Sequence, residues 1–233
     1  MQKRVTVFRL PRQPALLAVA LCLALLLALR GAAIKGQLQQ AMAPALFGVS
    51  LVIDAGHGGA DPGMVGDAVL EKDVNLAAAR CLASYCRSAG AGVTLTRESD
   101  AALSESKRAD LEQRVALAKT ARANVFISLH CNSYVADPSQ HGAQVFYAAG
   151  NEEGKRLAET LQRALCQQLG NTERTALPHP DSYLLKNIDC PAVIVEMGFL
   201  SNAAEEEALA SPDYQWELAW ALFRGLSDYL AGT

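Results

Sequence analysis

The sequence predicts a single α/β domain in which a mostly parallel sheet is covered by helices on both faces. Over most of the 233 residues, short β-branched runs alternate with longer amphipathic stretches, as in chains that build parallel sheets. Several runs are apolar throughout, which is typical of strands buried on both faces. With 51% hydrophobic and 19% charged residues, the chain does not belong to the disordered or collagen-like classes. Its length suits one domain.

Short apolar runs predict six strands and longer periodic stretches predict five helices. The predicted strands are 49–54, 93–96, 125–129, 142–148, 182–185 and 192–195. The predicted helices are about 71–90, 107–122, 152–169, 205–209 and 212–230.

The first half of the domain begins with a β-branched run that ends at Asp54, and a glycine-rich loop follows it. A helix is expected from Glu71, because apolar residues recur on one face from Leu76 onward until Gly90. The helix that begins at Lys107 also has one apolar side. Each of these two helices leads into a short β-branched strand.

In the second half, an alternating strand precedes a helix that Gly170 is expected to close, since glycine often follows the last helical residue. Residues 170–181 are predicted to be loop. Pro191 favours an extended backbone before the buried strand 192–195. Pro212 suits the first turn of the final helix.

The N-terminal region has the composition of an export signal. Residues 14–29 are all apolar, and four basic residues and no acid precede them. The apolar stretch is shorter than a comfortable bilayer span and longer than most cleavable cores. Ala41 and Ala43 suit a signal peptidase, but Pro44 disfavours cleavage there. We expect an uncleaved anchor, with cleavage the alternative. In both cases the body of the chain is expected to lie outside the cytoplasm.

We therefore expect the chain to divide into a signal peptide or anchor (1–30), a tether (31–48) and the α/β domain (49–231). Residues 1–30 hold five of the 21 basic residues and none of the 24 acidic ones. The remainder is acidic, which makes nucleic acid an unexpected partner.

The six cysteines are expected to be free thiols rather than a disulfide framework. Cys22 lies in the apolar segment, Cys81 and Cys86 point different ways on one helix, and the others are scattered through apolar surroundings. The spacing does not match a cysteine-rich zinc site.

Three predicted strands end at residues that can carry chemistry, namely His57, His130 and Glu196. Ligand sites of open α/β sheets lie at the carboxyl ends of strands, so these residues are expected to converge. Glu71 begins the helix after the glycine-rich loop, and its carboxylate can fold back beside His57. Taken singly, each residue has an ordinary structural explanation, but the four together indicate a site.

Two histidines and one carboxylate form a three-ligand set that suits catalytic Zn²⁺, with a fourth position open. We therefore expect one zinc ion held by His57, Glu71 and His130. Glu196 arrives from another strand end and is the expected general acid and base. This arrangement predicts a hydrolase.

Four sequence blocks resemble those of the zinc-dependent N-acetylmuramoyl-L-alanine amidases, in the same order and spacing. The blocks are IDAGHGG at 53–59, EKDVNL at 71–76, SLHCN at 128–132 and VEMGFLSN at 195–202. The resemblance implies a roughly six-stranded mixed sheet and cleavage of the amide between N-acetylmuramic acid and L-alanine in peptidoglycan. It also implies zinc ligation by His57, Glu71 and His130 and catalysis by Glu196.

A narrower likeness is to the compact spore-cortex, or germination-specific, amidases. It rests on TRESD at 96–100, DLEQRV at 110–115 and the absence of added wall-binding repeats. It implies stem-peptide removal during cortex maturation, with control through expression or an activating partner protein that the sequence does not identify.

Two alternatives stay open at this point. A zinc carboxypeptidase or endopeptidase would act within the stem peptide, and Arg97 or Arg174 would then be candidates to bind a terminal carboxylate. A non-catalytic wall-binding module would instead have a closed or empty metal site.

Overall fold

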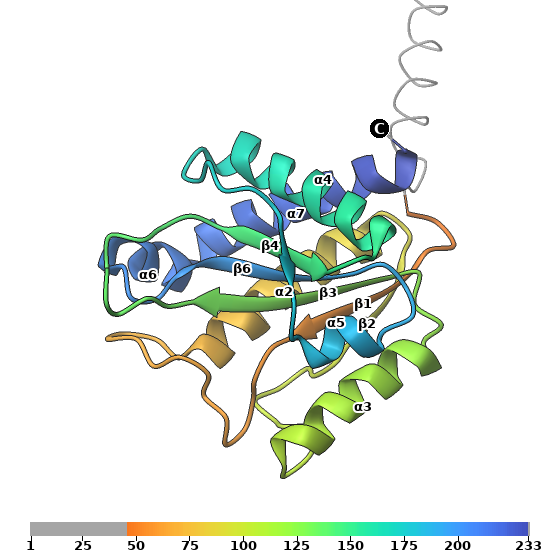
Figure 1. The fold of residues 1–233 in the computed structure, drawn as a ribbon, viewed down its shortest axis with the longest axis horizontal. Coiled ribbons are helices and arrows are strands. Elements are labelled where there is room, and N and C mark those ends of the chain that lie inside the picture. The colour runs from red at the N-terminus through yellow and green to blue at the C-terminus, as the bar shows by residue number, and fades with distance from the viewer. Residues whose placement is uncertain (1–45, 233) are drawn as a thin grey trace, which may run out of the picture. The chain divides into compact units, whose positions relative to one another are not determined.

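A computed structural model of the chain describes residues 46–232. Within this part, a six-stranded sheet in the order β2-β1-β3-β6-β4-β5 is flanked by helices on both faces (Figure 1). The sheet is mixed and mostly parallel, so the predicted fold class is confirmed. The predicted signal segment and most of the tether lie outside the described residues. None of the helices in the described part is both long enough and apolar enough to cross a membrane.

All neighbouring strands of the sheet are parallel except β6 and β4, which are antiparallel. Its strands are β1 (Ser50–Ala55), β2 (Gly92–Leu95), β3 (Val125–Asn132), β4 (Gln144–Ala148), β5 (Leu177–His179) and β6 (Ala192–Phe199). β1 pairs in parallel with β2 and β3, and β3 pairs in parallel with β6. β4 runs antiparallel to β6 and carries β5 in parallel on its other side.

The helices form two unequal layers. They are α2 (Glu71–Ser88), α3 (Lys107–Thr120), α4 (Glu152–Leu169), α5 (Tyr183–Asn187), α6 (Ala203–Ala210) and α7 (Pro212–Ala231). α2, α4 and α7 pack together and cover one face of the sheet, and α3 with the short α5 covers the other (Figure 1). α6 packs against β6 and α7 beside the sheet.

Side-chain alternation divides the strands between two apolar clusters. Ile53 and Ile127 belong to the large cluster under α2, α4 and α7. Val52 and Phe126, one position earlier, belong to the smaller cluster under α3 and α5. Successive residues of a strand point to opposite faces, so strands covered on both sides need apolar residues at every position. This explains the uninterrupted apolar runs in the sequence.

The prediction for 182–185 was wrong. These residues open helix α5 rather than a strand, because the Ser182 side chain accepts a hydrogen bond from the Leu185 backbone nitrogen at 3.3 Å and caps the helix. The predicted loop 170–181 contains β5 instead. Pro178 lies within β5, which an edge strand tolerates because one side of its backbone needs no partner strand.

The other elements agree with the predictions within a few residues. α4 has the predicted bounds, and Gly170 closes it in the left-handed conformation, with φ 64°. β3 and β6 are longer than predicted, so His130 and Glu196 lie inside paired strands. The cysteines of the described residues are free, as expected: Cys81, Cys86, Cys131, Cys166 and Cys190.

Candidate metal centre

His57 enters the site from the loop that follows β1. Its backbone has φ 63°, a left-handed conformation that is unusual for a residue with a side chain. The imidazole Nε2 lies 3.1 Å from Oε1 of Glu71. The other ring nitrogen, Nδ1, lies 2.9 Å from Oδ2 of Asp61. One ring nitrogen therefore faces the site and the other faces a carboxylate.

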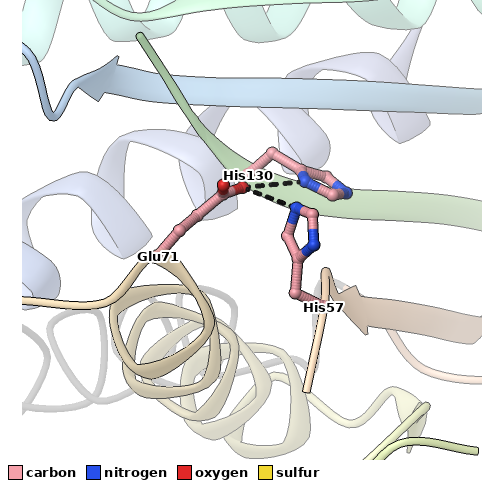
Figure 2. Close-up of side chains that lie close together, drawn as sticks. All are labelled: His57, Glu71 and His130. Atoms are coloured by element: carbon pink, nitrogen blue, oxygen red, sulfur yellow. Dashed lines mark hydrogen bonds and ion pairs between the residues drawn. The ribbon is translucent and has the colours of Figure 1, made fainter. Parts of the chain in front are cut away.

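Glu71 lies in the first turn of α2, and its carboxylate joins the two histidines. Oε1 lies 3.0 Å from Nδ1 of His130 and accepts a hydrogen bond from the Cys131 backbone nitrogen at 3.1 Å. Oε2 accepts one from the Met64 backbone nitrogen at 2.8 Å. In Figure 2 both imidazoles point at this carboxylate, which is 3% exposed as a residue.

These three side chains fit a metal ion. One ligand atom from each of His57, Glu71 and His130 lies within 4.8 Å of the others. The two imidazole rings are nearly perpendicular, at 80°, with centroids 4.9 Å apart, so their nitrogens converge from different directions. Two imidazole nitrogens and a carboxylate oxygen are donors that zinc takes in sites with an open fourth position. The structure thus brings together the three ligands that the sequence predicts.

The side chains of this site shift one another's pKa values. Burial raises the pKa of the Glu71 carboxyl, but hydrogen bonds and charge from His130 and His57 outweigh this and hold it well below its usual range. Burial lowers the pKa of His57, yet Glu71 and Asp61 together raise it above its ordinary value. Glu71 is consequently ionised, as a metal ligand must be.

Glu196 lies on β6 directly opposite His130 of β3 in the parallel register. Its Oε2 atom is buried and has no hydrogen-bond partner among the described residues. Burial raises the pKa of this carboxyl, and Glu71 raises it further against the opposing effect of His130. A carboxyl group with a raised pKa and a buried oxygen that has no partner in the described fold is suited to exchanging protons with a substrate.

Two glycines leave room for the candidate ligands. A Cβ atom on Gly56 would overlap the imidazole of His130, and one on Gly63 would overlap the carboxylate of Glu71. Gly63 also has φ 65°, which favours glycine. The glycine-rich loop is therefore required by close approach to the site.

The sequence reasoning missed Asp61 and Asn75. Asp61 faces His57 as described, and carboxylates commonly orient metal-binding histidines in this way. The Asn75 amide donates to Oε1 of Glu71 at 3.3 Å and to the Gly56 carbonyl at 3.2 Å. The only sequence signal was spacing, since each residue follows a ligand by four positions.

A cavity of about 770 Å³ adjoins His57 and His130 on the α3 and α5 side of the sheet. Ala102, Leu111 and Leu184 supply part of its apolar lining, and Lys107 supplies a positive charge. The cavity is thus large enough for several residues of an extended ligand beside the candidate metal centre.

The chain matches a known family over most of its length. The model of the family described as N-acetylmuramoyl-L-alanine amidase matches residues 51–228. The germination-specific N-acetylmuramoyl-L-alanine amidase of Bacillus subtilis is 40% identical over 194 residues, which are 79% of this chain and 81% of that protein.

Solved structures of similar proteins have the same fold. The CwlD amidase of Clostridioides difficile, in complex with the GerS lipoprotein, is 34% identical with a TM-score of 0.74, covering 78% of this chain and 98% of that one. The catalytic domain of CwlV, an amidase from Bacillus (Paenibacillus) polymyxa, is 33% identical with a TM-score of 0.70, again covering 78% and 98%. Family model, sequence and fold agree, and the chain belongs to the N-acetylmuramoyl-L-alanine amidase family.

Proposed function

We propose that this protein hydrolyses the amide between N-acetylmuramic acid and the L-alanine of the peptidoglycan stem peptide, using one zinc ion held by His57, Glu71 and His130. The observation that carries the proposal is the carboxyl group of Glu196 opposite His130, beside a two-histidine, one-carboxylate group. Its Oε2 atom is buried and has no hydrogen-bond partner among the described residues. Zinc, when bound, activates a water molecule for attack and polarises the scissile carbonyl.

Glu196 is the general base and then the general acid. It takes a proton from the attacking water and delivers a proton to the alanine nitrogen as the carbon–nitrogen bond breaks. Burial raises the pKa of its carboxyl, and pKa values shifted by burial are common among catalytic acids and bases, which supports this role. Asp61 holds the His57 ring through Nδ1 and leaves Nε2 directed at the metal position.

The peptidase alternative gains no support from the arginines that it would need. Arg97 is buried and donates to the backbone carbonyls of Ala55, Gly56, Lys72 and Ser99. Arg174 donates to Gln140, Gln144 and the His141 carbonyl. Both guanidinium groups are thus engaged within the fold, and a terminal carboxylate would have to displace these bonds.

The substrate and compartment follow from the family and the N-terminal sequence. We propose that residues 1–30 export the chain and anchor it in the membrane if uncleaved, that 31–48 tether it, and that 49–231 act on peptidoglycan on the cell-wall side. The similarity to a germination-specific amidase supports cortex peptidoglycan as the substrate. The structure of an amidase with a lipoprotein supports a partner protein here as well.

The test is product analysis with purified cortex or vegetative peptidoglycan. The full chain, in mild detergent and loaded with zinc, is incubated with and without chelator, and the products are identified by mass spectrometry. Intact stem peptides with free amino-terminal L-alanine, absent with chelator and restored by zinc, are expected. Fragments cut within the peptide would instead establish the peptidase alternative.

A matched control separates catalysis from binding. Glu196→Gln should release stem peptide at least about 100-fold more slowly while still binding zinc, because it keeps the side-chain shape and loses the proton carrier. Near wild-type release by Glu196→Gln would contradict the proposed mechanism.

A further inference from the structure

The loop that presents His57 is held against its own backbone preference. His57 has φ 63°, followed by Gly58 at φ 135° and Gly59 at φ 57°. Of these three residues, His57 alone pays a steric cost for a left-handed backbone, and such conformations persist where the surroundings over-determine them. The surroundings of this loop are therefore informative.

Two arginines donate hydrogen bonds to the three successive backbone carbonyl groups of residues 55–57. Arg114 donates to the carbonyl oxygens of Ala55 and His57, both at 2.9 Å. Arg97 donates to those of Ala55 at 2.9 Å and Gly56 at 3.1 Å. We call Arg97 and Arg114 the carbonyl clamp. It fixes three successive peptide groups, the last of them that of His57.

Arg97 also ties the loop to the helix that carries Glu71. The same Nη2 atom that donates to Gly56 donates to the carbonyl oxygen of Lys72 at 2.7 Å. Lys72 is the residue after Glu71 in the first turn of α2. One guanidinium group thus sets the separation between the segments that carry two of the three proposed ligands.

Arg114 is connected to β3, the strand that carries His130, the third proposed ligand. It forms a buried ion pair with Asp54, whose other carboxylate oxygen accepts from the Ser128 hydroxyl at 2.6 Å. Ser128 precedes His130 by two residues on β3, on the same face of the strand. The clamp therefore connects the backbones that present all three proposed ligands.

Stability alone is a weak reason for this arrangement. Arg97 is 4% exposed, and its hydrogen bonds go to carbonyl groups rather than carboxylates among the described residues. Burying a charge is costly, and well-packed apolar residues often stabilise a fold as well as buried ions do. What a planar guanidinium adds is fixed multi-donor geometry.

We propose that Arg97 and Arg114 are positioning residues that preorganise His57, Glu71 and His130 for the metal ion, so that their loss weakens zinc binding more than it weakens the fold. The inference rests on the zinc site proposed above. It assigns a role in metal affinity to residues that touch neither metal nor substrate.

The test measures zinc affinity of the full chain in mild detergent by competition with a chelator of known affinity. Arg97→Lys and Arg114→Lys keep the positive charge but lose the planar guanidinium group that donates several hydrogen bonds at once. Each should raise the zinc dissociation constant by about 10- to 100-fold, as loss of partners around metal ligands typically does. The visible spectrum of the Co²⁺-loaded protein should also change, because it reports ligand geometry.

Two controls separate positioning from general destabilisation. Arg87→Lys alters an exposed arginine that donates to a backbone carbonyl, that of Val93, away from the loop. Leu222→Ala removes a fully buried side chain from α7. Both should leave the zinc dissociation constant within about twofold of wild type, although Leu222→Ala lowers the unfolding temperature.

The outcomes distinguish this inference from the proposed function. Wild-type zinc affinity in both Arg97→Lys and Arg114→Lys would overturn the clamp and leave the zinc site standing. Equal weakening by Leu222→Ala would also overturn it, since the effect would then be one of stability. If Arg114→Lys does not fold, Arg97→Lys alone decides. A wild-type chain that binds no zinc would overturn the site itself and the clamp with it.

Discussion

The face of the sheet toward α2, α4 and α7 holds the larger apolar cluster, whereas the face toward α3 and α5 buries the ion pair of Asp54 and Arg114. On the first face, α4 and α7 approach closely where Gly225 meets Leu161 and Ala164. On the second, Asp54 and Arg114 are almost completely buried beneath the candidate metal centre. The buried charged residues of the described chain are Asp54, Glu71, Arg97, Arg114, Glu205 and Glu206, and none belongs to α4 or α7.

This difference indicates a division of labour between stability and chemistry. Apolar burial stabilises without fixing directions, whereas buried ions stabilise little and fix directions well. By strand alternation, His130 and Glu196 face the α3 and α5 side, where the ions and the cavity lie. Changes on the two faces should therefore have separable effects on stability and on function.

The largest effect is expected from Glu196→Gln on the polar face. Loss of a general acid and base should lower kcat by about 10²- to 10⁴-fold. The temperature of unfolding should not fall, because no described hydrogen bond to Oε2 is lost. Stem-peptide release and thermal unfolding are measured together, with the exposed Glu207→Gln as the control. Equal loss of activity in Glu196→Gln and Glu207→Gln would contradict a specific role of Glu196 in catalysis.

Asp54→Asn should cost stability in a pH-dependent way. Removing the Asp54 charge leaves Arg114 with Asp110 as its remaining ionic partner. The loss should cost about 3 kcal/mol at neutral pH, the lower end of what a broken buried pair costs. Burial raises the pKa of Asp54, but Arg114 and the hydrogen bonds from Ser128 and Thr96 outweigh it and hold the pKa below its usual value.

A carboxyl group whose pKa is lower in the folded state contributes stability above its unfolded pKa, near 3.9, and loses it as pH falls through the folded pKa. The difference between wild type and Asp54→Asn should therefore shrink below about pH 4. Urea unfolding of the metal-free protein between pH 3 and 7 measures this, and a pH-independent difference would contradict the assigned ion pair.

Leu222→Ala tests the apolar face. The side chain is fully buried in the cluster under α7, so its loss should cost about 2–5 kcal/mol through lost burial and a residual cavity. Turnover per folded molecule should be unchanged at a temperature well below unfolding. A fall in kcat larger than the folded fraction explains would show that the two faces are coupled.

The smallest effects on stability are expected from removing one helix cap on each face of the sheet. The Ser106 side chain caps α3 on the polar face, and the Asn151 side chain caps α4 on the apolar face. Ser106→Ala and Asn151→Ala should each cost about 1 kcal/mol, measured by urea unfolding. Zinc affinity should be unaffected in both, since Arg114 lies two turns inside α3. A selective loss of zinc affinity in Ser106→Ala would extend the clamp to the whole helix.

The sequence was informative where function depends on local pattern. Periodicity predicted all the long elements. Strand ends predicted that His57, His130 and Glu196 lie close together, because parallel strands present their carboxyl ends at one edge, and the start of a helix added Glu71. The prediction failed for α5, a helix of five residues, because the cap from the Ser182 side chain outweighed the strand propensity of the segment. The sequence also could not predict the pairing of Asp54 with Arg114, which are 60 positions apart and meet only when α3 docks.

The strand order has a consequence for biosynthesis. β6 is the last strand to be made, yet it lies between β3 and β4. The proposed ligands His57, Glu71 and His130 all precede residue 133, whereas Glu196 lies on β6. β4 also pairs with β6, so it has no central neighbour until β6 is made. A nascent chain therefore cannot complete the centre of its sheet, or place the proposed proton carrier Glu196, until β6 has been translated.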